Sequence, residues 1–204
     1  MRRRYRNLSP INLAQKFASV AFLQSRRVRL CYDDPTQTFC LRGDGIINKY
    51  MQEKGSWITG SHAMRDGLLD MFTDADLNFN PGGQNMTLGA LCKEMGEIEY
   101  DYLQSLKTFK TDFSYRNPDA GLDSSVAKLK AWYESLDAEM EQVLNAFSDE
   151  DFKKSIERAS GYTVPLEMQV EIYLQAILIF LGKLTIFLRA MNKTLPPAIQ
   201  EYIG

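Results

Sequence analysis

The chain contains a single histidine, His62, and this limits the chemistry that its side chains can perform. Histidine is the commonest metal ligand in proteins and the commonest general base near neutral pH. A chain with one histidine cannot build a site that requires two or three. Acid–base or metal chemistry would have to combine His62 with carboxylates, among which we consider Glu94 and Glu99 first.

His62 and Glu99 both fall on the apolar side of their predicted helices, and Glu94 falls at the border of that side. Burying a lone charge is costly, so Glu99 must be paired, hydrogen-bonded or protonated. A functional interpretation joins the three residues into a small acid–base or weak metal site between the first two helices. The structural interpretation, which we favour, has them satisfied by backbone groups or by the hydroxyls of Tyr100, Tyr102 and Tyr173.

Three further residues are weaker candidates. Glu171 and Gln175 lie four residues apart and could line one pocket, but carboxylate plus amide is a poor ligand set for zinc or nickel. Cys92 lies in an apolar stripe, where a free cysteine usually acts as a small hydrophobic residue. We therefore assign no catalytic residue and take as a candidate polar pocket His62, Glu94, Glu99, Glu171 and Gln175.

Long helices must position these side chains. Apolar residues recur at three- and four-residue steps within 47–72, 88–109 and 126–147, and the segment 169–196 is apolar on nearly every side. Thr87 is the expected N-cap of the second helix, and Asp123 or Ser124 that of the third. No alternating strand pattern is present.

A capping box at 148–151 predicts a short helix before the last long one. The sequence therefore predicts an all-α fold: a four-helix bundle with a short extra helix between helices three and four.

The segment 169–196 reads QVEIYLQAILIFLGKLTIFLRAMNKTLP and is long enough to cross a membrane. Gln175, Lys183 and Arg189 interrupt it, and a central Lys or Arg opposes insertion by roughly 2.5–3.5 kcal/mol. We therefore expect a helix of the bundle core, the most buried of the four, and no membrane.

Charge divides the chain into two parts. Residues 1–44 carry nine Lys/Arg against three acids, whereas the remaining 160 residues carry 15 basic and 23 acidic groups. We expect a basic N-terminal extension over 1–44 and the bundle over 45–204. The extension could be a targeting sequence, a basic arm for nucleic acid or lipid, a structural extension, or sequence upstream of a true start at Met51 or Met64. The last of these is favoured, and nucleic-acid binding is unlikely for a chain of net charge −2.

Three marks in the bundle resemble the DinB/YfiT-like superfamily. TDADLNFNPGGQNMTLGAL (73–91) resembles the family's acidic turn and Thr-Leu-Gly helix start, and EMGEIEYDYL (94–103) is similar to its H-x-x-E-x-E helix. GKLTIFLRAMNKTLPPAIQEYIG (182–204) resembles its C-terminal ending. Their order and spacing together cover roughly residues 45–204.

The resemblance implies a divalent metal on three histidines, and activities such as metal-dependent thiol S-transfer. Alignment places these ligand positions at Glu94, Ala176 and Phe180, none of which is histidine. We therefore expect the family's metal site to be lost, with no cofactor. Three cysteines without a CxxC pair fit a reducing, cytoplasmic setting.

Two functions from different classes remain open. The first is a non-catalytic protein that binds a small-molecule ligand or serves a structural role, working as a homodimer. The alternative is a thiol S-transferase-like enzyme with an altered site, which would need zinc or nickel. A weaker alternative is nucleic-acid association through the Arg-rich arm.

Overall fold

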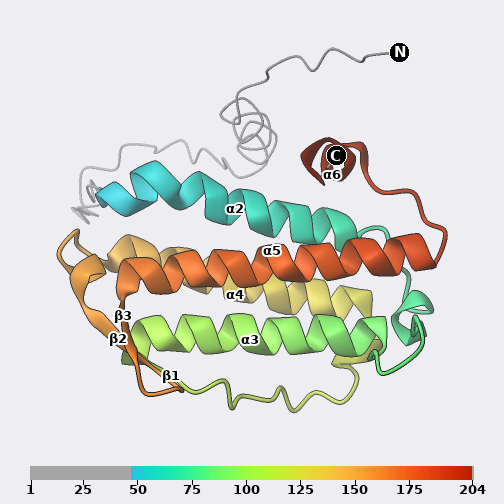
Figure 1. Ribbon diagram of the computed structural model, residues 1–204, viewed down its shortest axis with the longest axis horizontal. Helices are drawn as coiled ribbons and strands as arrows, with labels where there is room; N and C mark the ends of the chain where they lie inside the picture. Colours follow the sequence, from blue (N-terminus) through green and yellow to red (C-terminus); the bar gives the residue numbers. More distant parts are fainter. Residues whose placement is uncertain (1–46, 204) are drawn as a thin grey trace, which may run out of the picture.

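The computed structural model describes residues 47–203 and shows the predicted four-helix bundle (Figure 1). A short helix, α6 (Pro197–Ile203), follows the last long one. The basic extension predicted for 1–44 lies outside the described residues. The four long helices are α2 (Lys49–Leu69), α3 (Leu88–Thr108), α4 (Val126–Ala146) and α5 (Leu166–Ala190).

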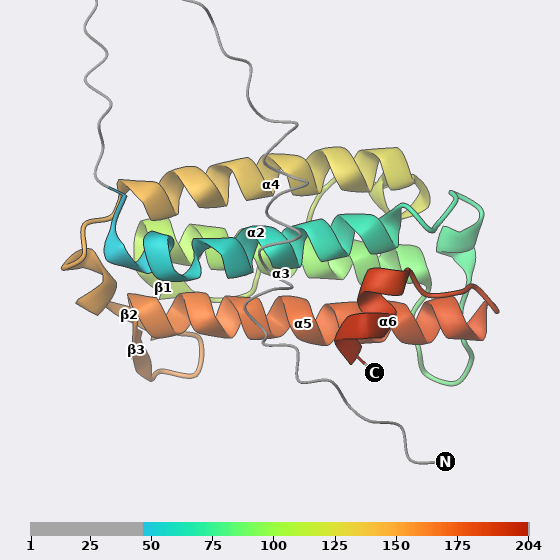
Figure 2. The ribbon, with the colours of Figure 1, turned by 90° about the horizontal axis from the view of Figure 1, so that it is seen from above.

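The helices form a square arrangement in which α2 and α3 lie on one diagonal and α4 and α5 on the other. α5 packs against α2 and α3, and α4 packs against the same two helices from the opposite side (Figures 1 and 2). The core between them is rich in leucine, and it includes the fully buried Leu68, Leu103, Leu129, Leu144 and Leu184.

Side-chain caps begin three of the helices. Asn48 accepts a hydrogen bond from the backbone N–H of Met51, and Thr87 accepts one from Ala90, as predicted. The third cap is Ser125, one residue beyond the predicted Asp123 or Ser124. Those two residues belong instead to a single 3₁₀ turn, η2 (Leu122–Ser124), which buries Leu122.

The short helix predicted after residue 148 is one 3₁₀ turn, η3 (Asp151–Lys153). The capping box is present, because the backbone N–H of Ser148 donates to Asp151 and the N–H of Asp151 donates back to the Ser148 hydroxyl. A third turn, η1 (Asp76–Asn78), lies in the acidic loop before α3.

A small sheet, absent from the predictions, follows η3. β2 (Ser155–Arg158) pairs antiparallel with β3 (Thr163–Pro165) and parallel with β1 (Lys110–Thr111). Each strand of the hairpin buries one apolar side chain, Ile156 or Val164. A single inward residue in each strand is too few to produce a detectable period of two.

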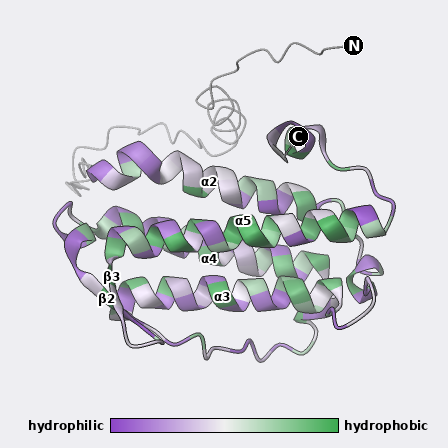
Figure 3. Cartoon of the chain, viewed as in Figure 1, coloured by the Kyte–Doolittle hydropathy of each residue, from purple (hydrophilic) through white to green (hydrophobic). Residues whose placement is uncertain are grey.

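The last long helix is less buried than predicted. In residues 47–203, α5 is the one helix long and apolar enough to cross a membrane, and half of its most apolar window is buried. Its inner face packs in the core, whereas Ile179 and Ile186 are exposed. Hydrophobic residues run along the visible side of α5 in Figure 3.

Gly89 allows α3 to lie directly against the backbone of η2. A Cβ atom at position 89 would come within 1.8 Å of the carbonyl oxygen of Asp123. Gly60, in the interior of α2, has open space where its Cβ would be.

We predict that Gly89→Ala lowers the free energy of unfolding by about 1–3 kcal/mol or more, because backbone atoms must move apart. The control, Gly60→Ala, should raise it by about 0.5–1 kcal/mol, since alanine is the better helix former. Urea unfolding followed by circular dichroism measures both. Equal stability of the two variants would contradict the close contact.

Candidate functional site

A fully buried arginine, Arg65, is the centre of a polar cluster in the bundle core. Its guanidinium donates to Glu99 Oε2 over 2.8 Å and to Asp137 Oδ2 over 2.6 Å. A second contact, from Nη1 to Asp137 Oδ1 at 3.1 Å, makes the pairing with Asp137 nearly bidentate. Asp66, which is more exposed, accepts two further hydrogen bonds from the same guanidinium. Arg65 is thus paired with three carboxylates.

Tyr133 supports the guanidinium from one side. The centre of its ring lies 4.1 Å from Arg65 Cζ, a favourable cation–π distance. Its hydroxyl donates to the backbone carbonyl of Cys92 over 2.7 Å, which fixes the ring between α3 and α4. The position of the buried cation is therefore set by packing as well as by charge.

His62 connects two members of the cluster. Its Nδ1 lies 3.1 Å from Asp137 Oδ1, and its Nε2 lies 2.7 Å from the hydroxyl of Tyr173. Burial, aided by the positive charge of Arg65, lowers the pKa of His62 to about 3, so the ring is neutral near pH 7. We assign the proton to Nδ1, where it is donated to Asp137, because Nε2 then accepts from Tyr173.

Glu99 completes the cluster. Its Oε2 lies 3.2 Å from the Tyr173 hydroxyl, and its Oε1 is buried with no hydrogen-bond partner among the described residues. Burial raises the pKa of Glu99 to about 7, against the opposing effect of Arg65. The Tyr173 hydroxyl, which can donate to Glu99 Oε2, also lies beside His62 Nε2, so polar contacts run from Glu99 through Tyr173 and His62 to Asp137.

The cluster resembles a metal site in composition but is filled by a cation of its own. Candidate ligand atoms of His62, Glu99 and Asp137 lie within 4.8 Å of one another, the one such group in residues 47–203. Arg65 binds both carboxylates, and both ring nitrogens of His62 are engaged. The residues therefore do not fit a divalent metal while Arg65 keeps its place.

The same contacts leave little for acid–base catalysis. His62 has no free nitrogen with which to accept a proton from a substrate, and it is almost fully buried. Cys92 is buried and free, and burial raises the pKa of its thiol to about 12. A thiol with that pKa is not a nucleophile near neutral pH.

The structure brings together two of the five predicted site residues, His62 and Glu99. They are connected through Arg65, Asp137 and Tyr173, the last of which was among the tyrosines considered. Glu94 is exposed and lies in a separate cavity. Glu171 forms a half-exposed ion pair with Lys54 at 3.5 Å, and Gln175 is exposed on the outer face of α5.

Sequence reasoning missed Arg65 and Asp137, although a signal was present. Arg65 is three residues after His62 and shares the apolar side of α2, and Asp137 is four residues after the buried Tyr133 on α4. The helical phase of both residues points to an inner face. Assigning every charged residue to a helix face by its phase would therefore have identified Arg65 and Asp137.

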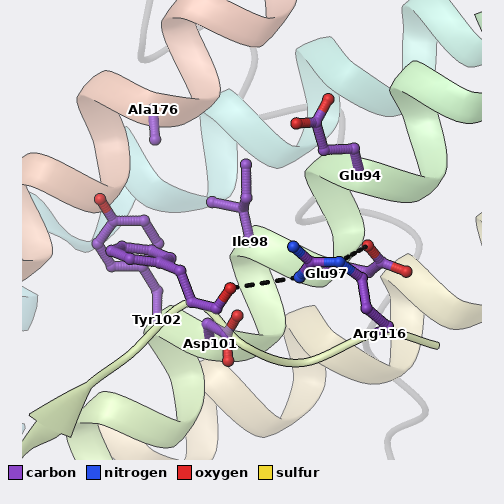
Figure 4. Close-up of a pocket in the computed structure, with 8 residues that line it drawn as sticks. Glu94, Glu97, Ile98, Asp101, Tyr102, Arg116 and Ala176 are labelled. Atoms are coloured by element: carbon purple, nitrogen blue, oxygen red, sulfur yellow. Dashed lines mark hydrogen bonds and ion pairs between the residues drawn. The ribbon is translucent and has the colours of Figure 1, made fainter. Parts of the chain in front are cut away.

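The separate cavity has a volume of about 530 Å³ and lies beside α3 and α5 (Figure 4). Glu94 on α3 and Ala176 on α5 both line it, so two of the three aligned ligand positions face one space. The third, Phe180, is buried in the hydrophobic core. Ala176 and Phe180 carry no ligand atom, so these positions do not fit a metal. The lining is Glu94, Glu97, Ile98, Asp101, Tyr102, Phe113, Arg116 and Ala176.

The carboxylates in this cavity exceed its cations. Glu97 accepts a hydrogen bond from the backbone N–H of Asn117 over 2.9 Å, and its Oε2 lies 3.7 Å from Arg116 Nε. The pKa of Asp101 is raised by burial and by the charge of Asp112, more than Arg116 lowers it. Burial is thus the main reason that the pKa of Asp101 is raised, and the neighbouring Asp112 adds to it.

Comparisons with known proteins identify the fold. No family description matches the sequence, and no curated protein matches it. Among solved structures, a DinB-like protein of Bacillus subtilis, YjoA, matches with a TM-score of 0.58 and 12% sequence identity. The match covers 71% of this chain and 96% of that protein. The DinB-like fold expected from the sequence marks is therefore confirmed.

We predict that Arg65→Met destabilises the protein by roughly 3–5 kcal/mol, because it leaves Glu99 and Asp137 buried without a cation. Urea unfolding at pH 7 measures the loss. The control is Arg116→Met, which removes an exposed arginine with one long ion pair and should cost less than about 0.5 kcal/mol. A loss below about 1 kcal/mol for Arg65→Met would show that the guanidinium does not hold the core charges.

Proposed function

We propose that this DinB-fold protein works without a metal, as a binding protein for small organic cations that enter the cavity between α3 and α5. The observation that carries the proposal is the lining of that cavity: three carboxylates and one arginine, beside two of the three positions where the family's metal ligands align.

Charge supports a cationic ligand. Glu94, Glu97 and Asp101 lie three or four residues apart, on one side of α3, and only Arg116 opposes them in the lining. A positively charged ligand would offset this excess of carboxylates over cations. The sequence marks resemble a family that includes thiol S-transferases, whose nucleophile is an anionic thiolate. The carboxylates of this cavity would repel a thiolate unless a metal ion accompanied it.

Shape and apolar surface support an organic ligand rather than a bare ion. The rings of Tyr102 and Phe113 stand together in the lining, 5.3 Å apart edge to face, and Ile98 and Ala176 add aliphatic surface. A cavity of about 530 Å³ is within the range of small-molecule sites. An amine on an aromatic or aliphatic body matches both the rings and the carboxylates.

Benzylamine and benzoate are a suitable pair of probes, since they have the same ring and opposite charges. We expect isothermal titration calorimetry of the full chain to show binding of benzylamine and none of benzoate. Asp101→Asn should weaken benzylamine binding at least about tenfold, since a hydrogen bond to a charged group contributes roughly 1.5–3 kcal/mol.

The matched control is Glu134→Gln, which removes a carboxylate from a different cavity, beside α2 and α4, and should leave the affinity unchanged. Equal binding of benzoate, or an unaltered affinity in Asp101→Asn, would contradict the proposal. The absence of binding at roughly 10 mM benzylamine would also contradict it, because the binding free energy would then be weaker than about 3 kcal/mol.

A further inference from the structure

The outer face of α5 carries a row of exposed hydrophobic side chains. Ile179 and Ile186 are 64% and 62% exposed, and Met168 is 52% exposed. Ile172 lies between Met168 and Ile179 along the helix and is partly exposed. Large apolar residues gathered on one face of a helix are typical of an interaction surface. Within residues 47–203, nothing in the structure covers this face.

Three residues of this row, Ile172, Ile179 and Ile186, recur every seven residues. With Met168, Gln175, Gly182 and Arg189 they fill the positions 168, 172, 175, 179, 182, 186 and 189, which alternate steps of four and three residues as a and d positions of a heptad repeat do. Isoleucine occupies each a position, and Met168 is the one apolar residue among the d positions. We call these seven residues the α5 seam. At Gly182 nothing lies within 4 Å of where a Cβ would be. A second helix can therefore approach the backbone closely at that point.

The charges on α5 indicate which way a partner helix would run. Glu167 and Glu171 are in its N-terminal half, and Lys183 and Arg189 are in its C-terminal half. A parallel copy would place like charges together. An antiparallel copy places the acidic half of each helix beside the basic half of the other.

We propose that α5 pairs with α5 of a second copy of this chain, antiparallel, about a two-fold axis at Ile179. In this register Ile179 packs against its own counterpart, and Ile172 packs against Ile186 of the other copy. Gln175 meets the region of Gly182 and Lys183, and Arg189 lies between the partner positions of Glu167 and Glu171. The interface is self-complementary, as a closed dimer requires.

Neighbouring residues of α2 extend the surface. Trp57 is 48% exposed, and Lys54, one turn away on α2, contacts Glu171 of α5. α5 itself is about 38 Å long, at about 1.5 Å for each of its 25 residues. An aromatic side chain beside a helical seam of this length is a common anchor of protein interfaces.

A second copy explains the face better than a lipid surface does. Lys183 and Arg189 interrupt the apolar residues, and burying either in a bilayer core costs roughly 2.5–3.5 kcal/mol. In the antiparallel pair Arg189 lies beside two carboxylates, and Lys183 lies opposite the polar Gln175. The dimer thus uses the apolar residues of the α5 seam together with its one charged residue, Arg189.

Light scattering coupled to size exclusion measures the first consequence on the full chain. We expect a dimer for the wild type and a monomer for Ile179→Glu, whose two carboxylates would meet on the axis. Circular dichroism should show an unchanged fold, since the side chain is exposed. The control, Tyr162→Glu, changes an exposed aromatic residue in the loop between β2 and β3 and should leave the dimer intact.

Cysteine cross-linking tests the register, in a chain with Cys31 and Cys40 replaced by serine. Ile179→Cys alone should form an intermolecular disulfide on oxidation, because it faces itself. Ile186→Cys alone should not, whereas the double variant Ile172→Cys/Ile186→Cys should.

A monomeric wild type would overturn the proposal. That is the result expected if residues 1–46 of the same chain, and not a second copy, cover the face. So would a dimer that survives Ile179→Glu, a disulfide from Ile186→Cys alone, or a wild-type chain that sediments with phosphatidylcholine vesicles.

Discussion

The pairing of Arg65 with Glu99 and Asp137 is the interaction on which the interior of the bundle depends. Arg65 and His62 come from α2, Glu99 from α3, Asp137 from α4, and Tyr173 from α5. Each of the four long helices therefore supplies one hydrogen-bonding group or more. A helix shifted by one turn would leave at least one buried charge unpaired, at a cost of several kilocalories per mole. The cluster thus sets the register of the helices, which leucine packing alone specifies less strictly.

The same pairing decides what chemistry the core can support. In residues 47–203, the one group of side chains with the composition of a metal site is already organised around a guanidinium. A guanidinium is permanently charged and cannot activate water or a thiol as a divalent ion does. Function is then expected on the outside of the core, where the acidic cavity and the α5 seam lie on different parts of the surface. A ligand in the cavity contacts α3 and α5, so a dimer through α5 and ligand binding would share one helix.

Some of this was readable from the sequence, for identifiable reasons. Helical phase located three of the helices and placed His62 and Glu99 inside, because apolar residues recur at three- and four-residue steps along each of them. The fourth was located by the length and apolar character of the segment 169–196. Phase cannot say which inner groups meet, since that depends on how four helices are rotated about their axes. Arg65 was overlooked because arginine is rarely fully buried. The hairpin of β2 and β3 was overlooked because it buries only two apolar side chains, Ile156 and Val164. The buried-helix prediction for α5 failed on its outer face, since an apolar stripe for a core and one for a partner look alike in sequence.

Metal content is the most direct test of the central claim that Arg65 takes the place of a metal ion. The full chain would be dialysed against zinc or nickel at pH 7, then against metal-free buffer, and analysed by mass spectrometry for bound metal. We predict far less than one metal ion per chain, with no difference between the wild type and Glu99→Gln. One tightly bound ion per chain that is lost in Glu99→Gln would contradict it. That result would show that His62, Glu99 and Asp137 bind the metal with Arg65 displaced, as an enzyme with an altered site requires.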